Sequence, residues 1–250
     1  MKRVNGKIVW RKPVARGIFI LAIELEDDIG TVFPGNFVML KTDGIENILP
    51  RPFSIFEKKE NVLKIMVKAV GAVTNKLFEC QLPQSVSIVG PLGNSFPLVK
   101  GNNIIVAGGI GLAPVFNLKQ HLEIEKIFVG FRTKEEAFLI DEISRINDYL
   151  ISTDDGSLYN RGFITDFVED YLIKNRNRPF NIYACGPEPF LKRLWDLGRR
   201  FEGTNIYGSF ETYMACGFGV CLGCTIDTPS GYVKVCTDGP VFNLTDIFGA

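Results

Sequence analysis

The 250-residue sequence has little histidine, no net charge and no long apolar segment. With 1 histidine, it offers no basis for histidine-centred catalysis. The 28 basic and 28 acidic residues cancel, which gives no indication of binding to nucleic acid or to an anionic membrane. Its apolar runs are short and interrupted by charges, which argues against a transmembrane helix. No apolar segment follows the N-terminal charges, so we expect no secretion signal and a cytoplasmic protein.

Cysteine is also scarce, but four of the 6 cysteines lie together near the C-terminus. Cys216, Cys221, Cys224 and Cys236 follow the spacing C-x4-C-x2-C-x11-C. This spacing is typical of plant-type 2Fe–2S sites, in which a loop gathers three thiolates and a later cysteine completes the ligand set. Glycines between the first three cysteines let the loop turn its N–H groups toward sulfur. The motif therefore predicts a 2Fe–2S cluster that transfers single electrons.

Zinc and disulfide bonds are the two structural alternatives for these cysteines. Zinc sites usually have two C-x2-C pairs, whereas this sequence has one. Disulfide bonds need an oxidising compartment, which the N-terminus does not indicate. We therefore favour the cluster, and we interpret Cys80 and the single histidine, His121, as structural residues.

The first third of the chain is predicted to form a β-barrel. Short β-type segments separated by turns occur at residues 7–10, 17–25, 36–41, 53–56, 61–70 and 85–89. Six segments at this spacing favour a closed antiparallel barrel.

Two stretches of this barrel carry groups that can bind a ligand. In Arg51-Pro52-Phe53-Ser54, a flat ring can lie on the strand end while the guanidinium takes a phosphate. A glycine turn before Thr74 opens a helix, whose first amides and dipole attract anions. Taken alone, the first stretch is more often an ordinary strand entry, and the second is compatible with a simple capped helix.

From residue 103 to about residue 200 the pattern changes to alternating strands and helices. Strands are expected at 103–107, 126–131, 149–153 and 180–184, and helices at 108–121, 135–143, 165–174 and 188–200. The alternation predicts a parallel sheet with its ligand crevice at the carboxyl ends of the strands. The glycine turn after the first of these strands lets the backbone approach a diphosphate.

This glycine turn is not the usual dinucleotide fingerprint. It reads G-x-G-x-x-P, ending at Pro114, and no acidic residue stands at the end of the second strand, where Arg132 occurs. An ordinary dinucleotide fold is therefore disfavoured. Arg132 leaves the choice between NADH and NADPH open, because it can meet a 2′-phosphate or remain a solvated surface charge.

The motifs in this order resemble the ferredoxin-reductase superfamily. R-P-F-S is followed by a K-x-x-G-x-x-T turn, by Gly90-Pro91-Leu92-Gly93, and by the strand–glycine turn–helix and C-G-P segments. The resemblance implies FAD in the barrel and NAD in the α/β domain. The implied FAD contacts are Arg51, Pro52, Phe53, Ser54, Met66, Val67, Lys68, Val73 and Thr74, and the implied nucleotide contacts are Gly108, Gly109, Gly111, Gly186 and Pro187.

The same resemblance implies two catalytic residues, Ser54 near flavin N5 and Cys185 near the nicotinamide. Cys185 is equally well read as a buried apolar residue. One departure from the superfamily is Val73, which stands where a second glycine usually precedes the threonine. This leaves the closeness of backbone to phosphate open.

Over its whole length the chain resembles the electron-transfer subunits of heteromeric, NAD-dependent dihydroorotate dehydrogenases, most specifically in M-A-C-G-x-G-x-C-L-G-C and C-x-D-G-P-V-F. The resemblance implies a relay from NAD(H) through FAD and the cluster to a separate FMN-containing catalytic subunit. That subunit oxidises dihydroorotate to orotate in pyrimidine biosynthesis. A heterotetramer with two copies of each chain is expected, without nucleic acid or membrane.

The expected organisation is an FAD-binding barrel at 1–98, an NAD-binding α/β domain at 99–203 and a 2Fe–2S subdomain at 204–250. Two other functions remain open. The chain has the layout of the small subunit of an NADH:ferredoxin NADP oxidoreductase or a sulfhydrogenase. It is also compatible with a redox-sensing module whose cluster takes no part in catalysis.

Overall fold

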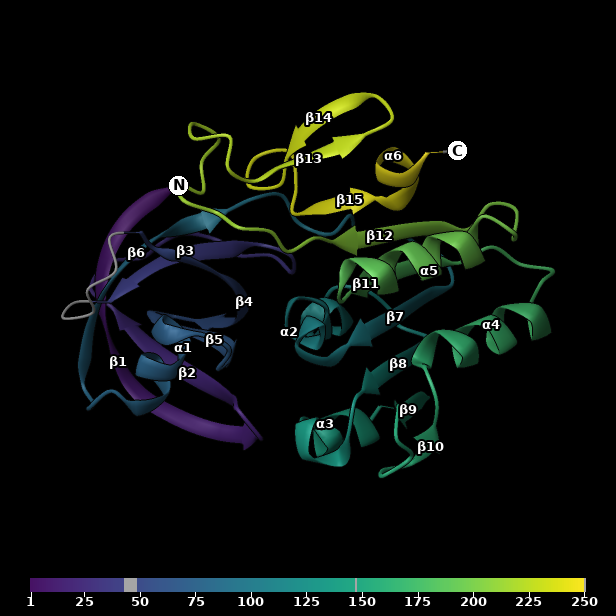
Figure 1. Cartoon of the computed structure of the whole chain (residues 1–250), viewed down its shortest axis with the longest axis horizontal. Coiled ribbons are helices and arrows are strands. Elements are labelled where there is room, and N and C mark those ends of the chain that lie inside the picture. Colours follow the sequence, from purple (N-terminus) through teal and green to yellow (C-terminus); the bar gives the residue numbers. More distant parts are fainter. Residues whose placement is uncertain (43–48, 147, 250) are drawn as a thin grey trace.

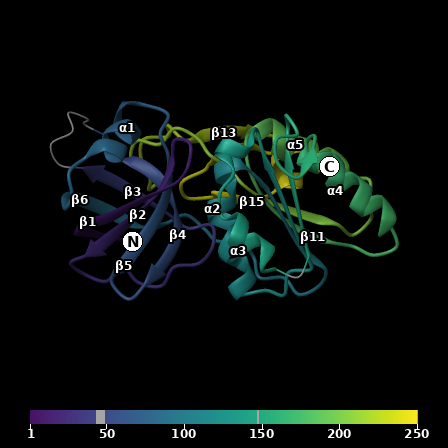
Figure 2. The same ribbon diagram turned by 90° about the horizontal axis from the view of Figure 1, so that it is seen from below.

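The computed structural model describes residues 1–42, 49–146 and 148–249. A β-barrel and an α/β unit lie side by side, and the C-terminal segment runs along one side of both (Figures 1 and 2). Within the described residues, no helix has the length and apolar character needed to cross a membrane.

Six antiparallel strands close the N-terminal barrel in the order β1–β2–β5–β4–β3–β6. They are β1 (Lys2–Ala15), β2 (Ile18–Leu25), β3 (Phe37–Thr42), β4 (Arg51–Lys59), β5 (Val62–Lys68) and β6 (Gln84–Leu92), with helix α1 (Ala72–Glu79) between β5 and β6. Every second residue of β6 is buried, as expected for a strand with one face toward a core. The interior is filled by aliphatic side chains such as Leu21, Leu63, Ile65 and Ile88. The predicted barrel is confirmed.

The α/β unit contains a seven-stranded sheet in the order β10–β9–β8–β7–β11–β12–β15. Its strands are β7 (Asn103–Gly108), β8 (Lys126–Phe131), β9 (Tyr149–Thr153), β10 (Asn160–Arg161), β11 (Asn181–Cys185), β12 (Asn205–Ser209) and β15 (Val241–Asn243). The first six are parallel, and β15 pairs antiparallel with β12. Every residue of β11 is buried, because helices and the barrel cover both faces of the sheet.

The helices agree with the prediction on one side of the sheet and differ on the other. Helices α4 (Ile164–Lys174) and α5 (Glu188–Gly198) lie close to the expected positions. The two remaining helices are instead interrupted, as η1 (Gly109–Gly111), α2 (Leu112–Val115) and η2 (Phe116–Gln120), and as η3 (Lys134–Glu136) and α3 (Ile140–Ser144). Gly109 and Leu139 have φ of 56°, and this left-handed conformation does not fit a continuous helix.

The C-terminal segment packs on both larger units. It forms a hairpin of β13 (Thr225–Thr228) and β14 (Gly231–Lys234), then β15 and helix α6 (Leu244–Phe248). Asn94, just after the barrel, holds this segment: its side chain donates to the carbonyl of Val241 at 2.7 Å and accepts from the Val241 N–H at 2.9 Å. Since β15 completes the α/β sheet, the C-terminal segment shares its core, and the boundaries at 98 and 203 stay predictions.

Candidate functional site

A cavity of about 680 Å³ lies between the barrel, helix α2 and the segment that follows β12. The sequence-predicted flavin contacts all line it: Arg51, Pro52, Phe53, Ser54, Met66, Val67, Lys68, Val73 and Thr74. They come from β4, from β5 and from the start of α1. Strands β4 and β5 are adjacent in the barrel, so the two motifs are brought together although they are separate in the sequence.

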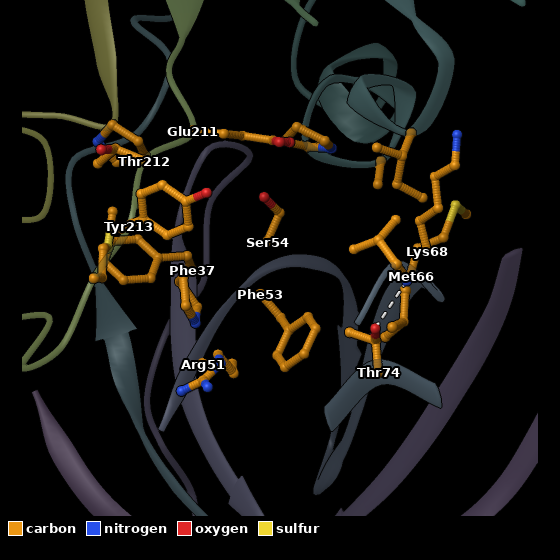
Figure 3. A pocket seen from close by; sticks show the side chains of 18 of the residues that line it. Phe37, Arg51, Phe53, Ser54, Met66, Lys68, Thr74, Glu211, Thr212 and Tyr213 are labelled. Carbon is orange, nitrogen blue, oxygen red and sulfur yellow. Dashed lines mark hydrogen bonds between the residues drawn. The ribbon is translucent and has the colours of Figure 1, made fainter. Parts of the chain in front are cut away.

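Strand β4 places its four motif residues at the entrance of this cavity. Figure 3 shows Phe53 projecting into the space, with Arg51 and Ser54 on either side of it. The Arg51 guanidinium donates to the carbonyl of Leu49 at 2.9 Å and to that of Pro50 at 3.3 Å, both from one nitrogen. Since a guanidinium has five N–H donors, Arg51 keeps donors for an anionic ligand.

The start of α1 also lines the cavity. The helix begins at Ala72, so Thr74 is its third residue and not its cap. The Thr74 hydroxyl accepts hydrogen bonds from the N–H groups of Val70 and Gly71, at 2.9 and 3.0 Å. It closes the turn and leaves the first-turn amides without helical partners. Val73 is 9% exposed and packs in the barrel core, which accommodates a valine at this position.

A second cavity, of about 730 Å³, lies at the carboxyl ends of β7, β8 and β11. All predicted nucleotide contacts line it, namely Gly108, Gly109, Gly111, Gly186 and Pro187. A Cβ on Gly111 would lie 2.3 Å from the carbonyl oxygen of Cys185. The two glycine turns are therefore in direct contact, and only glycine fits between them.

The two cavities meet along a common wall formed by Lys68, Ile110, Phe210 and Glu211, which line both of them. The Lys68 ammonium lies 2.9 Å from the Glu136 carboxylate, which itself lines the second cavity. Because Lys68 belongs to the barrel and Glu136 to η3, this ion pair joins the two units at the wall. Ligands in the two cavities would come together here.

Cys185 lies outside this wall. It is fully buried and lines neither cavity. Burial raises the pKa of the Cys185 thiol, and the Glu211 carboxylate adds to the shift. The thiol is therefore neutral at physiological pH, and its predicted place beside a nicotinamide stays a prediction.

Two residues that line the first cavity, Glu211 and Tyr213, were not predicted from the sequence. Glu211 lines both cavities and its side chain is exposed there, while the protein around it desolvates the carboxyl group enough to raise its pKa. Tyr213 is 93% exposed; its ring lies beside Phe37 with the hydroxyl on the side of Ser54 (Figure 3). Both follow the last parallel strand, and the rule that ligands bind at carboxyl ends of strands would have indicated them.

The four C-terminal cysteines interact with one another. Hydrogen bonds join the thiol of Cys216 to that of Cys221 and the thiol of Cys236 to that of Cys224, and Cys236 also interacts electrostatically with Cys216. Across residues 1–42, 49–146 and 148–249, no three histidine, cysteine or acidic side chains are arranged to hold a metal ion. Two pairs of thiols fit the two irons of a 2Fe–2S cluster, each of which takes two cysteines.

Backbone N–H groups of the loop point at these sulfurs. Desolvation acts to raise the pKa of Cys216, but hydrogen bonds from the amides of Cys221, Phe218 and Val220 outweigh it and lower the pKa to about 6. Burial and the neighbouring Cys224 raise the pKa of Cys236 to about 12, against a hydrogen bond from the Gly219 amide. Gly219 has φ of 85°, which favours glycine. Such amides stabilise thiolate ligands.

Comparisons with known proteins agree with this geometry. The family model described as "Iron-sulfur cluster binding domain of dihydroorotate dehydrogenase B" matches residues 211–248. The chain is 33% identical to the electron transfer subunit of dihydroorotate dehydrogenase B (NAD(+)) from Geobacillus sp. (strain WCH70), over 99% of both chains. It is 37% identical to the probable counterpart from Pyrococcus horikoshii, over 97% of this chain and 90% of that one. A chain of the NADH-dependent reduced ferredoxin-NADP oxidoreductase structure is similar with a TM-score of 0.84 and 28% identity, over 97% of this chain and 89% of that chain.

Proposed function

The chain belongs to the family of electron-transfer subunits of the NAD(+)-dependent dihydroorotate dehydrogenase B, and we propose that it carries electrons between NAD(H) and a separate catalytic subunit. That subunit would contain FMN and oxidise dihydroorotate to orotate in pyrimidine biosynthesis, in a heterotetramer with two copies of each chain. The observation that carries the proposal is the segment after β12. It lines both cavities at Glu211 and reaches the first cluster cysteine, Cys216, five residues later.

The first cavity suits FAD in size and in the chemistry of its lining. Arg51 and the first-turn amides of α1 would hold the diphosphate, because they offer a charge and free N–H donors to an anion. The rings of Phe53 and Tyr213 offer flat surfaces to an isoalloxazine ring, and the Ser54 hydroxyl offers a hydrogen bond near its N5.

The second cavity suits a nicotinamide dinucleotide. The backbone from Gly108 to Gly111 would take its diphosphate, since a turn without Cβ atoms lets phosphate approach the amides. The wall shared by the two cavities, including Lys68 and Glu211, would bring the nicotinamide to the flavin. When bound, FAD exchanges hydride with the nicotinamide and single electrons with an iron–sulfur cluster.

The cysteine loop offers a surface for the partner. Cys221 is exposed, and so are the apolar side chains around it: Phe218 at 45%, Val220 at 74% and Leu222 at 63%. Exposed apolar side chains gathered at one place are typical of protein–protein contacts. A partner covering them would approach the cluster closely enough to receive its electrons. We expect the pair of subunits in the cytoplasm, where a reducing environment keeps such thiols free.

The proposal is tested with the purified full-length chain. We expect about one FAD and one 2Fe–2S cluster per chain, identified by absorbance and by electron paramagnetic resonance of the reduced protein. NADH should bleach the cluster absorbance, and addition of the catalytic subunit should give dihydroorotate-dependent reduction of NAD(+). A chain that binds neither cofactor would contradict the proposal.

A second function is favoured by one observation, the TM-score of 0.84 to a chain of NADH-dependent reduced ferredoxin-NADP oxidoreductase. In that case the physiological partner would be another subunit of a ferredoxin-NADP oxidoreductase instead of a dihydroorotate dehydrogenase. Isolation of the native complex distinguishes the two functions. A complex of the first kind contains a partner that oxidises dihydroorotate, and a complex of the second kind does not.

A further inference from the structure

An ammonium group lies against the cysteine loop. The Nζ atom of Lys234, at the end of β14, is 3.6 Å from the position that a Cβ on Gly219 would occupy. Gly219 is in the middle of the loop, and its N–H bonds the thiol of Cys236. The charge of Lys234 is therefore adjacent to an amide that itself points at a cluster sulfur.

Within the part of the chain that the structure describes, no carboxylate lies within 4.0 Å of the Lys234 ammonium. The nearby Asp238 carboxylate accepts instead from the backbone N–H of Lys234 at 2.7 Å and from the Thr237 hydroxyl at 3.1 Å. The Lys234 side chain is only partly exposed, so solvent does not screen its charge fully.

We infer that Lys234 sets the reduction potential of the cluster, raising it by placing a positive charge beside the loop that holds it. This inference rests on the 2Fe–2S cluster of the proposed function. Reduction adds one electron, and hence negative charge, to a cluster already ligated by four thiolates. An unpaired ammonium at this place stabilises the reduced form more than the oxidised form.

The role of Lys234 differs from that of the thiols. Cys216, Cys221, Cys224 and Cys236 would decide whether the cluster binds, whereas Lys234 would decide how readily it accepts an electron. Potentials of such clusters depend on net charge and on hydrogen bonds to sulfur. Lys234 acts through the first of these, by placing its charge beside Gly219.

The test is a redox titration of the full-length chain loaded with FAD and cluster, with the reduced cluster read by electron paramagnetic resonance. Lys234→Met should lower the midpoint potential, so that at a fixed ambient potential the ratio of reduced to oxidised cluster falls about threefold to tenfold. Lys234→Glu should lower it further, and Lys234→Arg should restore it to about the wild-type value. Cluster content and the shape of the signal should not change.

The matched control is Lys174→Met, which removes an equal charge from the exposed end of α4, away from the cysteine loop (Figure 1). A Lys234→Met midpoint equal to wild type would overturn the inference, as would an equal shift in Lys174→Met. So would a Lys234→Met chain that keeps its potential and binds the catalytic subunit more weakly, which would assign the lysine to the interface.

Salt provides an independent check on the charge of Lys234. Raising the salt concentration screens the ammonium, so the difference in midpoint between the wild type and Lys234→Met should shrink. A difference that does not change with salt would contradict the inference. A wild-type chain without any cluster signal would overturn the proposed function itself, and this inference with it.

Discussion

The paired cavities and the cysteine loop are built in opposite ways. The wall shared by the cavities takes Lys68 from the barrel, Ile110 from the α/β unit and Glu211 from the segment beyond the last parallel strand. The cysteine loop instead takes all four thiols from residues 216–236. A site assembled from distant segments depends on how the units pack, whereas a site within one segment depends mainly on its local turns. The two regions should therefore respond differently to substitution.

The largest effect is expected in the cysteine loop. Cys221→Ser replaces one proposed ligand by a weaker one and should abolish electron delivery to the catalytic subunit while FAD remains bound. The measurement compares NADH-driven reduction of the catalytic subunit with the FAD content of the same preparation. Full activity of the variant would refute the ligand assignment, and loss of FAD would show that the two regions are not separable.

The surface around this loop should be next in sensitivity. Val220→Asp places a charge among the exposed apolar side chains, and we expect it to weaken binding of the catalytic subunit by about tenfold or more. Ile173→Asp, on the exposed face of α4, is the control, because Ile173 is also exposed, at 48%, but lies away from the loop. Affinities come from titration of the two subunits. Equal losses in both variants would remove the case for a docking surface at the cysteines.

The glycines of the two cavities allow a comparison within the assembled site. Gly111→Ala should lower the free energy of unfolding by about 1–3 kcal/mol and weaken NADH binding, because its Cβ would press on the Cys185 carbonyl. A Cβ on Gly71 would meet no atom of the described residues within 4 Å, so Gly71→Ala should cost only about 0.5 kcal/mol, from the less favourable alanine at the helix N-cap. Thermal unfolding and NADH titration measure both. Similar behaviour of the two variants would contradict the contact between the glycine turns.

The same contrast explains what the sequence could reveal. The cysteine spacing is a local pattern, and the barrel and parallel strands follow from periodicities within single elements. The residues proposed to contact flavin and nucleotide could be chosen from motifs that each occupy a few adjacent residues, such as Arg51–Ser54. Residues that line the cavities but lie outside such motifs could not be identified from the sequence.

Glu211 and Tyr213 are examples, because their place depends on how the segment after β12 lies between the two units. The interruption before α3 was missed because the left-handed conformation of Leu139 is rare for leucine and is not indicated by a local pattern. Lys234 likewise looks like an ordinary strand lysine until the hairpin brings it to Gly219.

The smallest expected effect concerns Glu211. It tests whether the protein around the two cavities desolvates the Glu211 carboxylate. Burial raises the pKa of its carboxyl group in the folded protein, so the folded state holds the proton to higher pH than the unfolded chain does. Stability from this residue is then greatest at low pH and declines as pH rises through the folded pKa. Glutamine does not ionise, so residue 211 no longer contributes to the pH dependence of stability in Glu211→Gln.

The variant should therefore gain thermal stability relative to the wild type as pH increases from about 5 to 8, in protein without nucleotide. Asp166→Gln is a useful control, because Asp166 lines only the nucleotide cavity and is not part of the shared wall. If the difference between Glu211→Gln and wild type stays constant with pH, the carboxylate is solvated and the shared wall is open to water. A difference that grows with pH would show that the protein desolvates Glu211 at the place where the two proposed ligands meet.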